Sequence, residues 1–275
     1  MSNFLFKTVL LFHLFFFAYP VNSLQANWIK LDEGIEFSEF ETSTESAGDG
    51  VKITVLRATP KYYELKLLTS SDAGGGSMTV KEWAYKYNLL AVINAGMYQE
   101  DGKTNVGYMK SKGRVINSHI AKAYKTMLTL DPKDRSDKEF QIIDLECNND
   151  NSTFSRYRTL VQNIRMISCK QQNVWSQQAA SWSIAALGMD KSGNILFLMS
   201  VTPLTVHEFI DIILNLPIRI YNAMYLEGGK QASLYINIGG KEIERSGRGG
   251  VYLSNKNTKD SYWPIPNVLG LVKKK

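Results

Sequence analysis

The sequence contains few of the residues that build metal centres and catalytic triads. It has two cysteines and three histidines, and His13, His119 and His207 are widely separated. Zinc sites need clustered cysteine and histidine ligands, and a serine-hydrolase elbow needs a G-x-S-x-G motif, which is missing. We therefore expect no metal site, no Ser-His-Asp triad and no cofactor.

The sequence also lacks an interior basic run interleaved with aromatic residues. The formal net charge is +6, but Lys273, Lys274 and Lys275 supply half of it at one terminus. The glycine-rich segment 72–77 is not followed by G-K-[ST], so it does not match a phosphate-binding loop. These absences argue against nucleic acid as a partner.

Only one long apolar run is present, and it lies at the N-terminus. Lys7 is the one charged residue before the apolar stretch 9–18, and small residues follow at Ser23 and Ala26. This order predicts a signal peptide over residues 1–23, with cleavage after Ser23 or Ala26. The alternative, a membrane anchor, needs about 20 apolar residues. We expect an exported protein, secreted or periplasmic, with no transmembrane segment in the mature chain.

The two cysteines are an even count in a chain that we expect to be exported. Export favours a disulfide between Cys147 and Cys169, which would close a loop of 22 residues. The alternative is two buried free thiols.

The hydrophobic pattern predicts short strands around two helices. Residues 27–275 contain no repeat and no long linker, and 44% of the whole sequence is hydrophobic. Capping-box patterns at Thr79 and Thr205 predict the helix starts. The fold class that follows is α+β, a single domain with a mixed, mostly antiparallel sheet and a few flanking helices. The expected helices are 79–88 and 205–214, and the expected strands are 51–56, 63–68, 89–93, 106–110, 113–117, 126–131, 140–145, 184–189, 195–201, 223–226 and 233–238.

Two turns combine a polar side chain with glycine directly after an apolar strand. The first is segment 94–98, Asn-Ala-Gly-Met-Tyr, and the second is segment 227–229, Glu-Gly-Gly. Glycine permits close approach of the backbone to a ligand, and a strand end holds a polar group in place. Both segments are candidate binding sites, although each could be an ordinary turn.

These segments resemble motifs of the phosphodiester glycosidase family. The family pattern N-G-G-[FM]-[FY] is similar to residues 94–98, with Gly107 as the later glycine, and its A-[LM]-x-L-D-G-G-x-S pattern is similar to residues 223–233. Between them, residues 162–166 and 186–190 occupy the places of two further motifs. The resemblance covers residues 50–272 or so, which is nearly all of the mature chain.

Several positions depart from the family pattern, so the chain resembles a divergent branch. Glu227 replaces the usual aspartate, and Asn163-Ile164-Arg165 replaces Ser-Gly-Pro. Segment 181–185 lacks an arginine that the family often has, and segment 124–128 also differs.

The resemblance implies an exported hydrolase that cleaves a glycosyl phosphodiester or a related cell-envelope glycan. Such chemistry needs a carboxylate for the developing positive charge on the sugar and cations for the phosphate. We assign catalytic roles to Glu227, Asn94 and Arg165, with Arg165 and Lys125 as phosphate ligands. The expected substrate-binding residues are Gly96, Met97, Tyr98, Gly107, Lys125, Gln162, Ser183, Gly228 and Gly229.

Other interpretations of these residues and of the chain remain open. Glu227 could be a salt-bridged turn residue, Asn94 could bridge backbone groups, and Arg165 could point to solvent from a strand. The chain could also be a non-catalytic glycan-binding protein or a structural envelope protein. The enzyme hypothesis predicts that the Asn94, Arg165 and Glu227 side chains line one cleft within about 10 Å of one another.

Overall fold

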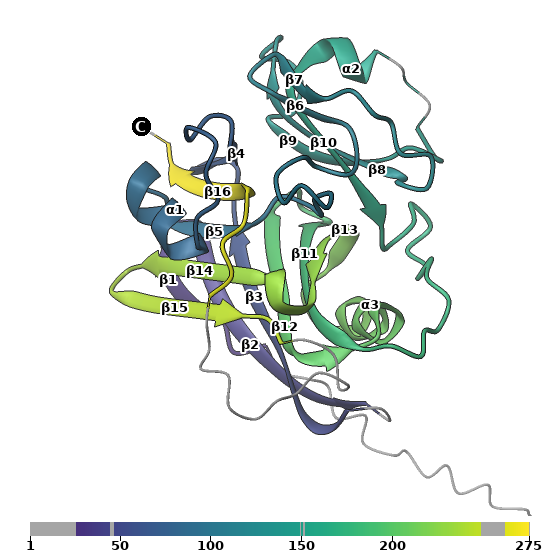
Figure 1. Ribbon diagram of the computed structural model, residues 1–275. Coiled ribbons are helices and arrows are strands. Elements are labelled where there is room, and N and C mark those ends of the chain that lie inside the picture. Colours follow the sequence, from purple (N-terminus) through teal and green to yellow (C-terminus); the bar gives the residue numbers. More distant parts are fainter. Residues whose placement is uncertain (1–25, 45–46, 149, 151, 249–261, 275) are drawn as a thin grey trace, which may run out of the picture.

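The computed structural model describes residues 26–44, 47–148, 150, 152–248 and 262–274 (Figure 1). The signal peptide predicted at residues 1–23 lies outside these residues. The helical elements are α1 (Val80–Tyr87), α2 (Thr153–Arg156), α3 (Val206–Asn215) and the 3-10 turn η1 (Gly229–Gln231). The strands are β1 (Ile29–Asp32), β2 (Ile35–Thr44), β3 (Gly48–Ala58), β4 (Tyr63–Thr69), β5 (Ala91–Asn94), β6 (Met109–Ser111), β7 (Arg114–Asn117), β8 (Thr126–Pro132), β9 (Phe140–Asp144), β10 (Tyr157–Arg165), β11 (Trp182–Asp190), β12 (Ile195–Leu204), β13 (Ile220–Gly228), β14 (Ser233–Ile238), β15 (Lys241–Ser246) and β16 (Asn267–Lys273).

The strands form two sheets. The larger sheet has the order β1-β2-β3-β12-β11-β13-β10-β6-β7, and β8 and β9 extend it by pairing with β10 and with each other. The smaller sheet has the order β15-β14-β5-β16-β4. The chain passes from the larger sheet to the smaller one between β13 and β14, directly after Glu227.

The two sheets enclose the main hydrophobic core. Side chains such as Leu56 and Phe197 from the larger sheet are buried in the same cluster as Ile93 and Leu269 from the smaller sheet. Helix α3 covers the outer face of the larger sheet, and α1 covers the outer face of the smaller sheet (Figure 1). Each helix buries one apolar stripe, which gives a helix–sheet–sheet–helix arrangement.

Both predicted helix starts are confirmed. Thr79 caps α1 and Thr205 caps α3, and in each case the carboxylate of the glutamate three residues later accepts a hydrogen bond from the backbone N–H of the cap residue. These reciprocal bonds satisfy amide groups that the first turn of a helix leaves without partners. Asn88 ends α1 in a left-handed conformation, with φ of 51°.

Strands predominate in the described residues, and the helical content is small. The prediction of a mostly antiparallel sheet is confirmed. Every ladder between the described strands is antiparallel, whereas the sequence pattern predicts a mixed, mostly antiparallel sheet. The expected strands are present, but the sequence analysis does not predict β1, β2, β10, β15 and β16. Strand β10 escaped detection because two of its inner residues, Gln162 and Asn163, are polar and yet buried.

A disulfide joins Cys147 to Cys169, as the sequence predicted. Their Cα atoms are 6.5 Å apart, and the bridge connects the segment after β9 to the segment after β10. Across the described residues, no helix is both long and apolar enough to span a bilayer.

Removing this disulfide should lower stability. The double substitution Cys147→Ser and Cys169→Ser should cost about 3 kcal/mol of unfolding free energy, because the unfolded chain regains the freedom of a 22-residue loop. Urea unfolding measures this, with reduced wild-type protein as the control. Thiol titration of the unfolded, unreduced wild type should find no free thiol, and two free thiols would contradict the pairing.

Candidate active site

Glu227 lies at the end of β13, where the larger sheet gives way to the crossover. In the ladder with β11, Glu227 pairs with Ala185, and the register shifts by one residue just before this pair. Such a bulge re-aims the side chains next to it. The Glu227 carboxylate accepts a hydrogen bond from the Gly228 N–H at 3.0 Å.

The surroundings of Glu227 favour its neutral form. Burial raises the pKa of Glu227 from 4.5 to about 7, and the hydrogen bond from Gly228 offsets only part of this rise. Within the described chain, no lysine or arginine forms an ion pair with Glu227. The interpretation as a salt-bridged turn residue therefore finds no support among these residues.

Three tyrosines lie close enough to this carboxyl group to respond to its charge. Burial raises the pKa of Tyr98, Tyr124 and Tyr225, and the negative charge of Glu227 raises each pKa further. The Trp182 indole N–H donates to the Tyr225 hydroxyl at 3.0 Å. We call Glu227, these three tyrosines and Gly228 the Glu227 site. Its aromatic walls suit the apolar face of a sugar ring.

Gly228 is required by the packing beside the carboxylate. A Cβ atom at this position would lie 2.0 Å from the Tyr225 hydroxyl oxygen and 2.5 Å from the Trp182 ring. Neither ring can retreat freely, because the two share a hydrogen bond and Trp175 packs on Tyr225 with ring centroids 5.7 Å apart. Gly229, the next residue, begins the 3-10 turn with φ of 65°.

Asn94 holds the crossover that follows Glu227. Its side-chain amide donates to the Gln231 carbonyl at 2.8 Å and accepts from the Ser233 N–H at 2.8 Å. Asn94 is buried, and both the nitrogen and the oxygen of its side-chain amide are hydrogen-bonded to backbone groups. The two turns singled out in the sequence therefore meet, and Asn94 joins them as a positioning residue.

The rest of the first turn brings Tyr98 toward Glu227. Gly96 has no room for a side chain, since a Cβ would lie 2.5 Å from Asn163 Oδ1 and 2.9 Å from Asn105 Oδ1. Met97 is half-buried against the core beneath α3. These contacts fix the direction of the chain as it reaches Tyr98.

Gln162 and Gly107 shape the loop that carries Tyr124. The Gln162 amide accepts from the Tyr108 and Ala121 N–H groups and donates to the Ala121 and Tyr124 carbonyls. All four bonds go to backbone, so Gln162 clamps this loop. A Cβ at Gly107 would lie 2.6 Å from the Gln162 carbonyl oxygen and 3.0 Å from the Tyr124 ring.

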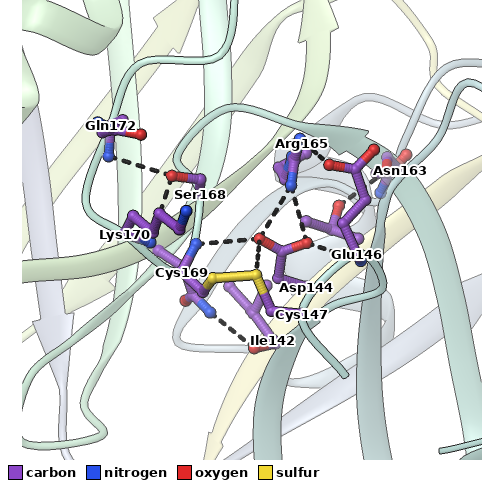
Figure 2. A network of polar contacts seen from close by, with 12 residues as sticks. Ile142, Asp144, Glu146, Cys147, Asn163, Arg165, Ser168, Cys169, Lys170 and Gln172 are labelled. Carbon is purple, nitrogen blue, oxygen red and sulfur yellow. Dashed lines mark hydrogen bonds and ion pairs between the residues drawn. A yellow bond between two sulfur atoms is a disulfide. The ribbon is translucent and has the colours of Figure 1, made fainter. Parts of the chain in front are cut away.

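Arg165 is engaged by two carboxylates. Its Nη1 lies 3.0 Å from Asp144 Oδ1, and its Nη2 lies 2.5 Å from Glu146 Oε2 (Figure 2). Asp144 also accepts from the Cys169 N–H at 3.0 Å, beside the disulfide. The guanidinium therefore does not point to solvent, which contradicts one of the alternatives considered for Arg165. Its positive charge is balanced by the Asp144 and Glu146 carboxylates.

Lys125 and Arg165 nevertheless line one groove of about 290 Å³, with Ile164, Trp175 and Gln178 among its other residues. Trp175 belongs to this groove and also packs on Tyr225, so the groove borders the Glu227 site. Lys125 forms no ion pair within the described chain and is the available cation there.

Ser183 is buried and fully used by the backbone. It donates to the Val201 carbonyl at 2.6 Å and accepts from the Arg248 N–H at 2.8 Å. Arg248 is exposed, and the residue before it lies against the Glu227 crossover, since a Cβ at Gly247 would lie 1.9 Å from the Gly229 carbonyl oxygen. Sequence patterns gave no signal for this neighbourhood, because Arg248 is distant along the chain.

The described residues contain one grouping of potential metal ligands, Asp144 with Cys147 and Cys169. Both sulfurs are joined in the disulfide, so they offer no thiolate.

The structure thus unites the segments of Asn94 and Glu227 and places Arg165 on the neighbouring strand, with Arg165 paired to Met224. The expected approach of the three side chains to within about 10 Å stays a prediction. Tyr124 and Tyr225 were missed by sequence reasoning. The alternation Tyr225-Leu226-Glu227 could have suggested the second of them.

Known proteins resemble this chain in sequence pattern and in fold. A family model described as phosphodiester glycosidase matches residues 87–272. The catalytic domain of zebrafish N-acetylglucosamine-1-phosphodiester alpha-N-acetylglucosaminidase, auto-inhibited by its pro-peptide, has a TM-score of 0.65 at 13% identity over 92% of this chain and 86% of that one. A hypothetical protein from Synechocystis has a TM-score of 0.61 at 13% identity, with 92% and 64% covered. A Burkholderia pseudomallei protein inferred to be exported has a TM-score of 0.54 at 11% identity, with 81% and 74% covered. A search of curated proteins gives no significant match.

Gly228→Ala should be destabilising. The added methyl group would collide with Tyr225 and Trp182, and overpacking of this kind costs about 1–3 kcal/mol. Gly76→Ala is the matched control, because a Cβ there meets no atom within 4 Å. Urea unfolding of both variants checks this, and equal stabilities would show that the packing beside Glu227 is loose.

Glu227→Gln should change the pH dependence of stability. Since the folded protein binds this proton more tightly than the unfolded chain, stability contributed by neutral Glu227 is present below pH 4.5 and is lost as the pH rises to about 7. The variant should match wild type at low pH and exceed its unfolding free energy by up to about 3 kcal/mol above pH 7. Urea unfolding at pH 4.5 and pH 8 tests this, with exposed Glu100→Gln as control. A pH-independent difference would contradict it.

Proposed function

The chain belongs to the phosphodiester glycosidase family, and on that basis we propose that it hydrolyses a glycosyl phosphodiester or a related cell-envelope glycan outside the cytoplasm. The observation that carries the proposal is Glu227, a carboxyl group at a strand end whose pKa is raised to about 7. Perturbed carboxyl groups beside aromatic walls are typical of sites that process sugars.

The proposed reaction breaks the bond between the anomeric carbon of the sugar and the oxygen that links it to the phosphate. The phosphate monoester leaves with the electron pair, and a water adds to the anomeric carbon with loss of a proton. Ionised Glu227 would stabilise the positive charge that develops on the sugar or would accept the proton of that water. Because a phosphate monoester leaves with little protonation, a separate general acid is not required.

The groove of Lys125 and Arg165 is the proposed place for the phosphate. Arg165 together with Asp144 and Glu146 carries a net negative charge, so attraction of a phosphate depends mainly on Lys125. Arg165 could add a bidentate contact only if Glu146, whose side chain is 48% exposed, turned into solvent.

Export is part of the proposal. Residues 1–23 would be removed as a signal peptide, and residues 27–275 would form the mature glycosidase-like domain. The Cys147–Cys169 disulfide supports an oxidising compartment, because such bonds are rare in the cytosol.

The second candidate is a glycan-binding protein without turnover. Two observations favour it: the Asn94 amide is consumed by backbone groups, and Arg165 is held by two carboxylates. Both would leave Glu227 with fewer catalytic partners than the sequence suggested.

The decisive experiment measures turnover of a panel of sugar 1-phosphates whose phosphate is esterified with a methyl or a 4-methylumbelliferyl group. Release of the free sugar is the readout. With wild type, kcat/KM should rise with pH to a plateau above about pH 7, because the ionised carboxylate is the active form. Glu227→Gln should lower turnover by at least about 100-fold, the scale of losing one key electrostatic group.

Two further variants sharpen the result. Glu227→Asp restores the residue of the family pattern and should retain or raise activity, while exposed Glu100→Gln should behave as wild type. Full turnover by Glu227→Gln would remove Glu227 from the mechanism. Binding of a sugar 1-phosphate by calorimetry without turnover of any ester would favour the glycan-binding alternative.

A further inference from the structure

A second concave surface lies at the opposite end of β13 from Glu227. A cavity of about 670 Å³ includes Tyr221 and the β11–β12 turn, and a cavity of about 960 Å³ shares Glu139 and Lys274 with it. We call the two together the basic trough. Tyr221 and Glu227 are six residues apart on one strand, which corresponds to roughly 20 Å, so the trough is separate from the Glu227 site.

Positive charge in the trough is not balanced by its acids. Lys61, Lys138 and Lys191 line the smaller cavity from three different segments, and none forms an ion pair within the described chain. Glu139 is used by Lys274. Lys61 lies over the Tyr62 ring at 4.9 Å, a contact without an ion pair.

Asp190, the other acid of this cavity, is committed to the turn. Its carboxylate accepts from the Ser192 N–H at 2.8 Å and the Asn194 N–H at 2.9 Å, and it lies 3.5 Å from Arg57 Nε. Asp190 is buried, so the exposed charges of the smaller cavity are those of its lysines and of Glu139, which Lys274 pairs.

The backbone at two lysines of the trough, Lys191 and Lys274, is held in place. The Lys191 N–H donates to the Arg219 carbonyl at 2.9 Å, and the Lys274 N–H donates to the Tyr62 carbonyl at 2.8 Å. Tyr221, 39% exposed, adds an aromatic ring to the smaller cavity, and Tyr87 adds one to the larger. Rings of this kind stack on sugars, and the fixed backbone reduces the entropy lost on binding.

We propose that the basic trough binds an acidic glycan, a sugar chain that carries phosphate, sulfate or carboxylate groups. The cations come from separate segments around two adjoining cavities, and Arg135 adds one in the larger cavity. A compact anion would need donors that converge on one point, whereas cations from separate segments, with an aromatic ring in each cavity, fit a repeating acidic sugar chain. The trough would hold the protein on such a chain without involving the Glu227 site.

The test measures binding of low-mass dextran sulfate by calorimetry, with neutral dextran and polyphosphate as comparison ligands. Wild type should bind dextran sulfate, more weakly as salt rises, and should bind both comparison ligands at least tenfold more weakly. The triple variant Lys61→Ala, Lys138→Ala, Lys191→Ala should lose at least tenfold in affinity.

The matched control is Lys30→Ala, Lys112→Ala, Lys170→Ala, which removes the same charge from exposed lysines outside the trough. It should bind dextran sulfate as wild type does. Equal weakening in the two triple variants would overturn the proposal in favour of non-specific charge attraction, and equal affinity for polyphosphate would overturn the sugar component. Glu227→Gln should bind as wild type, so failure of the catalytic proposal would not affect this result.

Discussion

The Asn94 side chain holds the place where the chain leaves one sheet and enters the other. Its amide bonds to Gln231 and Ser233 fix the crossover that begins directly after Glu227. Because both partners are backbone groups and the amide is buried, loss of this side chain would leave polar groups unpaired in a dry environment. The position of the Glu227 carboxyl group therefore depends on a residue that does not need to touch a substrate.

Electrostatics divide the surroundings of the crossover into two parts. Around Glu227 the walls are tyrosine and tryptophan, no described cation pairs with the carboxylate, and its proton is held to about pH 7. On the adjacent strand, Arg165 is surrounded by acids, and Lys125 alone supplies an uncompensated charge. A substrate with a neutral ring and one anionic group would match this division, the ring at Glu227 and the anion toward Lys125.

Local patterns in the sequence predict most of the helices and strands. Capping boxes at Thr79 and Thr205, and apolar alternation in most strands, predicted elements that form through short-range contacts. Strand β10 was missed because Gln162 and Asn163 interrupt its apolar pattern, and they are buried only because loops and turns far along the chain supply hydrogen-bond partners. Similarly, the acid partners of Arg165 come from the segment around Asp144, and no periodicity in the sequence announces an ion pair across such a distance.

A sequence motif marks positions, but it does not distinguish residues that take part in the reaction from residues that hold the backbone in place. Asn94, Gln162 and Ser183 all fall in or near the family-like segments, yet the polar side-chain atoms of each are hydrogen-bonded to backbone groups. Glu227 differs, since the hydrogen bond that it accepts comes from the neighbouring Gly228 N–H, and burial leaves its carboxyl group with an unusually high proton affinity. A group that a fold buries without a compensating charge costs stability when it ionises. That cost is more easily understood at a site of chemistry than in a turn, which could use a neutral side chain without penalty.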